Sequence, residues 1–198
     1  MNDIQSNKNV EVTFGLATLS PLNQNLALSI NSPTADPALT GTPRIIKIQN
    51  NGSDSANNVQ MNTPFFPVGT MITNNTCTGA LNAGATCDIT ITPGANASLD
   101  AQNSACTSIG TTPVSTTVTI SADNVPSTQV NILVLGYGCI YEGGFLFSIN
   151  DTTANTGSIG GKVAALTDEL GPGSTFQWTT KAGPTNATSI TNGHFNTR

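Results

Sequence analysis

The amino-acid sequence predicts an all-β protein: an antiparallel β-sandwich followed by a small, β-rich C-terminal segment. Three observations lead to this fold class. Seven short segments between Gln5 and Gly138 have the alternating or β-branched apolar pattern of strands. Turn signals rich in Gly, Pro and Asn separate these segments. No segment has the apolar spacing of an amphipathic helix over more than two turns.

Each predicted strand is bounded by residues that end it. The strands cover Val10–Phe14, Leu26–Ile30, Arg44–Gln49, Asn58–Met61, Cys87–Thr92, Val114–Ala122 and Gln129–Leu135. The strand that ends at Met61 is followed by Pro64-Phe65-Phe66-Pro67, where the prolines exclude a central strand and the aromatic rings need a core. The small, polar residues at 94–112 indicate a long loop, with one helical turn at 98–100. The run Ile132–Leu135 is continuously apolar and predicts a strand buried on both faces.

Seven strands within about 130 residues are typical of an immunoglobulin-like sandwich. The Cys…Trp…Cys core signature of antibody domains is absent, because the single tryptophan is Trp178. The prediction therefore depends on the strand count, and a closed barrel or jelly roll is the structural alternative.

The chain divides into three parts by its composition. Residues 1–9 are polar and predict a flexible arm. Residues 10–138 form the predicted sandwich. After a boundary near 138–140, residues 139–198 become aromatic and Gly-rich, and the block at 162–166 suits a strand or a helix. This part is small for an independent core, and we expect it to be an incomplete domain.

Charged residues are scarce, since Lys and Arg number 6 and Asp and Glu 11 among 198 residues. Asn, Thr and Ser together make up 70 residues. Six cations neutralise few phosphates, so we expect no nucleic-acid partner. The longest apolar run has four residues, far short of a membrane span, so we expect no membrane insertion.

The four cysteines predict disulfides and an oxidising compartment. Cys77, Cys87, Cys106 and Cys139 are separated by 10, 19 and 33 positions, and none forms the Cys-x-x-Cys pair of zinc ribbons or redox sites. A Cys77–Cys87 bridge is favoured because the intervening chain can return on itself, which leaves Cys106–Cys139 as the second bridge. Sequence alone allows three connectivities, and free buried thiols are the other alternative. We expect an extracellular or bacterial cell-surface protein whose signal peptide has been removed.

Two stretches resemble known families. The pattern Cys77-x-Gly-x-Leu-x-x-Gly-x-x-Cys87-x-Ile-x-Ile-x-Pro93 resembles bacterial secreted immunoglobulin-like repeats, and this resemblance covers about residues 10–138. The stretch Tyr141-Glu142-Gly143-Gly144-Phe145 resembles the start of the C-terminal, lectin-like domain of the Legionella collagen-like adhesin family. Trp178 and the segment 192–197 match later positions of that family in type and order, and the segment 157–165 agrees with those members that follow immunoglobulin-like modules. The resemblance implies a surface or secreted adhesive protein.

Catalytic and metal-binding chemistry has little support, and we expect neither an enzyme nor a cofactor. His194 is the single histidine, and no Gly-x-Ser-x-Gly elbow is present. The carboxylates that could form a glycosidase pair are Asp88, Asp100, Glu142, Asp151, Asp168 and Glu169. The loop Asn150–Gly157 offers oxygen ligands for calcium but lacks the acidic count and terminal Glu of an EF-hand.

Two functions are consistent with this pattern. The first is a non-catalytic module for adhesion or surface presentation, with a host or cell-surface glycan or protein as its partner. The second is a structural subunit that self-associates into a fibre or oligomer by strand addition. In that case, the arm that leads into Val10, Val12 and Phe14 would pair with a neighbour's sheet edge.

Overall fold

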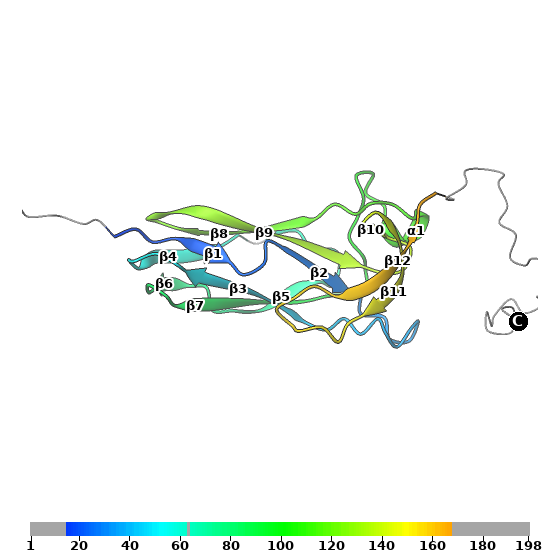
Figure 1. The fold of residues 1–198 in the computed structure, drawn as a ribbon, viewed down its shortest axis with the longest axis horizontal. Coiled ribbons are helices and arrows are strands. Elements are labelled where there is room, and N and C mark those ends of the chain that lie inside the picture. The colour runs from blue at the N-terminus through cyan, green and yellow to red at the C-terminus, as the bar shows by residue number, and fades with distance from the viewer. Residues whose placement is uncertain (1–14, 63, 168–198) are drawn as a thin grey trace, which may run out of the picture. The chain divides into compact units, whose positions relative to one another are not determined.

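A computed structural model describes residues 15–62 and 64–167 (Figure 1). Within these residues, twelve strands and one helical turn follow one another. They are β1 (Leu19–Pro21), β2 (Asn25–Ser29), β3 (Arg44–Asn50), β4 (Ala56–Met61), β5 (Met71–Asn75), β6 (Gly79–Leu81), β7 (Thr86–Thr92), α1 (Cys106–Ile109), β8 (Thr116–Ala122), β9 (Val125–Leu135), β10 (Ile140–Tyr141), β11 (Gly144–Asn150) and β12 (Gly160–Ala165). The predicted arm at 1–9 and the predicted strand Val10–Phe14 lie outside the described residues.

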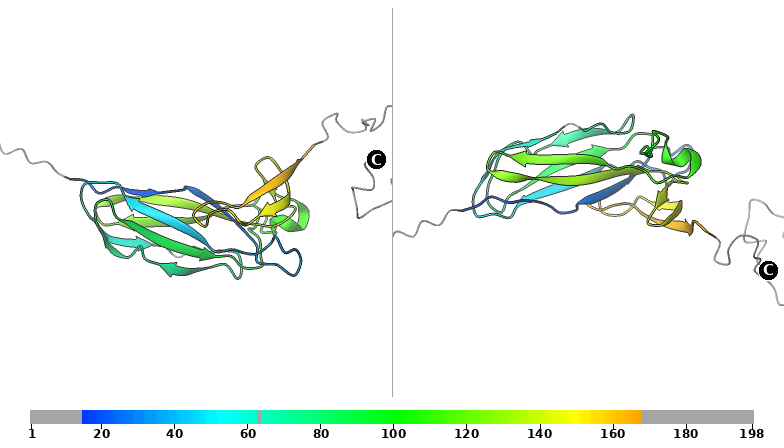
Figure 2. Two further views of the ribbon diagram at one scale, coloured as in Figure 1. Left: turned by 60° about the horizontal axis from the view of Figure 1, so that its bottom comes forward. Right: turned by 90° about the horizontal axis from the view of Figure 1, so that it is seen from above.

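Two sheets stack face to face, which confirms the predicted all-β, immunoglobulin-like sandwich (Figure 2). One sheet has the strand order β1-β3-β7-β5 and the other the order β2-β9-β8-β4-β6. The pairings are antiparallel except for β2 and β9, which run parallel with Asn25 opposite Asn131 and Ser29 opposite Leu135. The first part of the chain thus contributes β1 to one sheet and β2 to the other.

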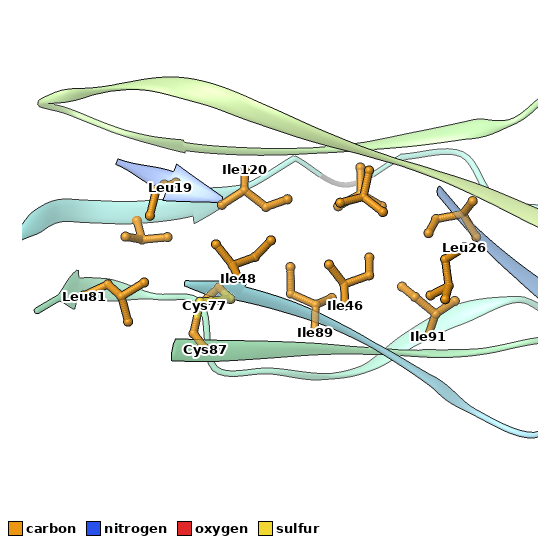
Figure 3. Packing of buried hydrophobic residues seen from close by; sticks show 14 of the residues in the cluster. Leu19, Leu26, Ile46, Ile48, Cys77, Leu81, Cys87, Ile89, Ile91 and Ile120 are labelled. Atoms are coloured by element: carbon orange, nitrogen blue, oxygen red, sulfur yellow. A yellow bond between two sulfur atoms is a disulfide. The ribbon is translucent and has the colours of Figure 1, made fainter. Parts of the chain in front are cut away.

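The main core lies between the two sheets (Figure 3). Strands β3 and β7 alternate buried and less buried positions, so that Ile46, Ile48, Ile89 and Ile91 all point inward. From the opposite sheet, β8 and β9 contribute valines and isoleucines with the same period of two. This alternation is the pattern from which the strands were predicted.

A third, smaller sheet follows the sandwich, with the order β10-β11-β12. It encloses a second core in which Leu146 and Ile149 of β11 pack with Ala27 and Leu135 from β2 and β9. Leu133 also packs against this second core, whereas its neighbour Ile132 belongs to the main core. Strand β9 therefore has apolar neighbours on both faces at this end, as its continuous apolar run predicted. The domain boundary near 138–140 stays a prediction.

Both disulfides have the pairing that the sequence favours. Cys77 bonds to Cys87 and Cys106 bonds to Cys139. The first bridge lies in the main core, and the second joins α1 to the chain just before β10 in the second core. Two disulfides indicate an oxidising environment such as the extracellular space.

The structure differs from the sequence-based expectation in several elements. Strands β1, β5 and β6 were not predicted, and β1 and β6 have only three residues each. The helical turn in the long loop is at Cys106–Ile109 and not at 98–100, where Leu99 instead forms an isolated bridge with Ala105. Most of the block at 162–166 lies in strand β12, which pairs with β11.

Candidate functional site

An open, mostly apolar groove, here called the Phe65 groove, lies on the described part of the chain. It has a volume of about 840 Å³, which is large enough for a small ligand or a short segment of a larger one. Three chain segments line it: residues 62–68 without Thr63, residues 96–105, and residues 114–117 at the start of β8.

Large apolar side chains around the groove are exposed to solvent. Phe65 is 100% exposed, Val68 78%, Val114 55% and Leu99 44%. Single exposed apolar residues are common on proteins, but a contiguous group around a concavity marks a surface for interaction. The aromatic ring of Phe65 is the largest apolar group that this surface offers to a partner.

The prediction that both aromatic rings of the Pro64–Pro67 segment enter a core is wrong for Phe65. Phe66 packs against the main core, whereas Phe65 does not. Successive side chains of an extended segment point to opposite sides, so adjacent aromatic residues between two prolines cannot both face inward. The Phe-Phe pair was therefore the sequence signal for this surface.

Hydrogen bonds to the backbone hold the groove walls in place. The Asn96 side-chain amide donates to the Val68 carbonyl oxygen at 3.0 Å. The Thr116 hydroxyl donates to the Phe65 carbonyl oxygen at 3.3 Å. On the opposite wall, the Val114 N–H donates to the Leu99 carbonyl oxygen at 2.7 Å. Each of these bonds ties together two of the three segments, so the exposed side chains project from a connected frame.

Asp100 organises the loop beside the groove. Its carboxylate accepts hydrogen bonds from the backbone N–H groups of Gln102 and Ser104, both at 2.9 Å. The N–H of Ser104 is the main cause of a lowered Asp100 pKa; burial opposes it, and the Thr111 hydroxyl and the Gln102 N–H add to the lowering. The Asp100 carboxylate is thus engaged in shaping the loop that carries Leu99.

Gly94 brings two loops together at the end of the groove. A β-carbon on Gly94 would lie 2.5 Å from the Gly69 carbonyl carbon, and backbone atoms cannot yield to it cheaply. We expect Gly94→Ala to lower the free energy of unfolding by about 1–3 kcal/mol, because the two loops must separate. Urea unfolding monitored by circular dichroism measures this change.

Gly160→Ala is the matched control for this substitution. A β-carbon on Gly160 would have its nearest contact at 3.5 Å, an ordinary van der Waals distance. The control should therefore unfold at nearly the wild-type urea concentration. Equal stabilities for Gly94→Ala and Gly160→Ala would contradict the close approach of the two loops.

The candidate carboxylates that the structure describes are mostly engaged elsewhere. Asp88 forms an ion pair with Lys47 at 2.6 Å, on the half-exposed outer side of the four-stranded sheet. Glu142 lies in the turn between β10 and β11 and is exposed. Asp168, Glu169 and His194 lie outside the described residues, as does Trp178.

Asp151 forms a buried ion pair with Arg44 of β3. The guanidinium is fully buried, and its Nη2 lies 2.5 Å from Asp151 Oδ1. The other carboxylate oxygen, Oδ2, accepts hydrogen bonds from the Ser29 hydroxyl at 2.6 Å, from the Thr42 N–H at 3.0 Å and from the Thr40 hydroxyl. One carboxylate therefore joins the loop after β11 to β2, β3 and the chain between them.

The loop that the sequence offered as a calcium site surrounds this same guanidinium. The two N–H groups of Arg44 Nη1 are shared among four acceptors: the carbonyl oxygens of Thr153, Ala154 and Gly157 at 3.2, 2.7 and 2.9 Å, and the Thr153 hydroxyl oxygen at 2.8 Å. These oxygens are the groups that a hard cation would use. Here the side chain of Arg44 supplies the positive charge to them.

The pKa of Asp151 lies below its usual range. Burial alone would raise the pKa, but hydrogen bonds from Ser29, Thr40, Thr42 and Arg44 stabilise the ionised form more strongly. The ion pair is therefore fully formed at neutral pH.

Among residues 15–62 and 64–167, no three His, Cys, Asp or Glu side chains are grouped as metal ligands. No helix among those residues is long and apolar enough to cross a membrane. The absence of an enzymatic function stays a prediction. The Phe65 groove offers a partner an apolar surface, with amides and hydroxyls at its rim.

Comparison with known proteins found similarity among solved structures but not among family models or curated proteins. No family model and no curated protein matches the chain. Among solved structures, the secreted serine protease VesC from Vibrio cholerae is similar, with 18% sequence identity and a TM-score of 0.36. The match covers 59% of this chain but only 22% of the protease chain.

Proposed function

We propose that this protein is a non-catalytic extracellular module that binds a partner through the Phe65 groove, in adhesion or presentation at a bacterial surface. The observation that carries the proposal is the full exposure of Phe65 beside three other exposed apolar side chains. A group of exposed apolar side chains lowers the solubility of a protein. A binding function would explain why such a group is present.

Three further features support an adhesive surface module. The disulfides suit an oxidising environment. The segment between Cys77 and Pro93 resembles bacterial secreted immunoglobulin-like repeats. The stretch that begins at Tyr141 resembles the Legionella collagen-like adhesin family, whose members include adhesins. Together these features favour adhesion over a purely structural role.

The groove suits an uncharged partner. Its one acidic residue, Asp100, is buried and engaged by the loop backbone, and no Lys or Arg lines the groove. The rim instead offers the amides of Asn62 and Asn103 and the hydroxyl of Thr116, next to an aromatic face. This combination suits a neutral sugar ring or an uncharged protein loop.

We expect Phe65→Ser to weaken binding at least about tenfold, because an aromatic anchor at the centre of an interface dominates its affinity. Fluorescently labelled protein would be applied to an array of purified neutral glycans and to monolayers of cultured mammalian cells. Phe147→Ser is the matched control, because Phe147 is 57% exposed on β11 and does not line the groove.

The expected result is that wild type and Phe147→Ser bind with equal strength and Phe65→Ser does not. Binding to the array points to a glycan, and binding to protease-sensitive sites on cells alone points to a protein. The proposal is overturned if the wild type binds neither surface, or if Phe65→Ser binds as tightly as the wild type.

A further inference from the structure

The outer edge of strand β5 is open. β5 is the last strand of the four-stranded sheet and pairs with β7 on one side only. Within the described residues, the backbone of Met71–Asn75 makes no hydrogen bond other than those to β7. Unpaired N–H and C=O groups along such an edge are a template for another strand.

The other edges of the described sheets are short, covered, charged or interrupted by proline. β1 contains Pro21, which has no N–H to donate, and β6 and β10 have three and two residues. The edge of β2 is covered, because Ala27 donates its N–H to the Ser158 hydroxyl at 2.9 Å and accepts from the Ile159 N–H at 3.0 Å. β12 carries Lys162, a charge that opposes pairing.

Strand β5 is not protected in any of these ways, although it does contain a bulge. Its sequence, Met-Ile-Thr-Asn-Asn, contains neither a charge nor a proline. The pairing with β7 shifts between Ile72 and Asn74, and such a bulge twists an edge and limits pairing to a short strand. Ile72 packs against the main core but is only partly buried, and Met71 is 54% exposed. An added short strand would therefore cover apolar surface as well as backbone.

The segment Val10–Phe14 fits this edge. Its sequence alternates strictly, so that in a strand Val10, Val12 and Phe14 would share one face and Glu11 and Thr13 the other. Placed beside β5, its apolar face would extend the main core over Ile72, and its polar face would remain in water.

The sheet order determines which copy of the chain receives the segment. Residues 1–14 precede β1, and β1 and β5 are opposite edges of the same sheet. To reach β5 of its own sheet, the segment would have to cross three strand spacings, about 14 Å, over the outer face. The β5 edge of a second copy needs no such crossing.

We propose that Val10–Phe14 of one copy adds to the β5 edge of a second copy. The donor and acceptor surfaces differ, so the contact is heterologous. Each copy would then accept a strand at β5 and donate one from its N-terminal segment, so the assembly can grow into a ring or an open filament. This inference goes beyond the proposed binding function, since it uses neither the Phe65 groove nor its residues.

Light scattering coupled to size-exclusion chromatography, at rising concentrations of the full chain, tests the proposal. The wild type should exceed the mass of a dimer as its concentration rises. Asn74→Lys blocks the acceptor edge and Val12→Lys blocks the donor, so each should remain a monomer by itself. Ser121→Lys is the matched control: it adds the same charge at an exposed position of β8, which is paired on both sides, and should assemble like the wild type.

Mixing the two blocked variants gives the sharpest result. Asn74→Lys retains a free donor and Val12→Lys retains a free acceptor, so an equimolar mixture should form a 1:1 complex that grows no further. Met71→Lys provides a second edge variant if circular dichroism shows that Asn74→Lys is not folded. A wild type that is monomeric at all concentrations, or a mixture that gives no 1:1 complex, overturns the proposal.

Discussion

Arg44→Met is expected to lower the free energy of unfolding by about 3–5 kcal/mol, because it leaves the buried Asp151 carboxylate without its counter-charge. The loss extends beyond one ion pair. The carbonyl oxygens of Thr153, Ala154 and Gly157 lose their donor as well, so the loop after β11 loses its side-chain attachment to β3 and keeps the backbone hydrogen bond from Ile45 to Asn155. Urea unfolding of the full chain at neutral pH measures the change.

A second ion pair on the same strand provides the control. Lys47 is three residues from Arg44, and its pair with Asp88 has a similar length but side chains that are 35% and 33% exposed. Lys47→Met should therefore cost at most about 1 kcal/mol. The double variant Arg44→Met/Asp151→Leu should lose less than the sum of the two single changes, since no unpaired charge remains buried. Equal losses for Arg44→Met and Lys47→Met would contradict the role of burial.

The same pair gives stability a dependence on acid. The pKa of Asp151 is lower in the folded chain than the ordinary value near 3.9 of an unfolded one. Its contribution is therefore complete above about pH 4 and is lost as the pH falls through the folded value. In urea unfolding at successive acidic pH values, the wild type should lose more stability than Asp151→Asn. Parallel pH profiles for the two proteins would exclude this contribution.

Removal of the Cys106–Cys139 disulfide is expected to have the second large effect. The bridge closes a loop with a sequence separation of 33, against 10 for Cys77–Cys87. A disulfide that closes a longer loop restricts the unfolded chain more, so its removal costs more stability. Cys106→Ala/Cys139→Ala should therefore lower the free energy of unfolding by about 3.7 kcal/mol, and Cys77→Ala/Cys87→Ala by about 2.7 kcal/mol. Both Cys106 and Cys139 are fully buried in the second core, so packing adds to the larger loss.

Urea unfolding of the two double variants under non-reducing conditions separates these effects. Each variant keeps the other bridge, so the comparison is internal. The Cys106→Ala/Cys139→Ala protein should unfold at the lower urea concentration. The opposite order would show that loop length does not govern the stability that these bridges provide.

The sequence predicted the sandwich because its central strands follow a simple rule. In β3, β7 and β8, apolar residues recur at every second position, and each of these strands has a neighbour on both sides. Strand β5 lies at an edge, so its side chains are less buried and Met-Ile-Thr-Asn-Asn shows no clear alternation. The short β1 and β6 have too few residues to show any period.

The sites were less visible in the sequence than the fold. Arg44 and Asp151 are 107 positions apart, and only the packing of the third sheet on the sandwich brings them together. The Lys and Arg residues are scattered along the sequence, and their positions gave no sign that Arg44 is buried. The groove combines three separate segments, and of these only the adjacent Phe65 and Phe66 carried a signal that local geometry could have revealed.

The cage of loop oxygens around Arg44 has a consequence for where the protein can work. Many extracellular modules hold their loops with calcium and change shape when chelators or acidic surroundings remove it. Here the cation is covalently part of the chain, so it can be neither chelated nor diluted away. We therefore expect the form of residues 151–157 not to depend on the divalent-ion content of the surroundings.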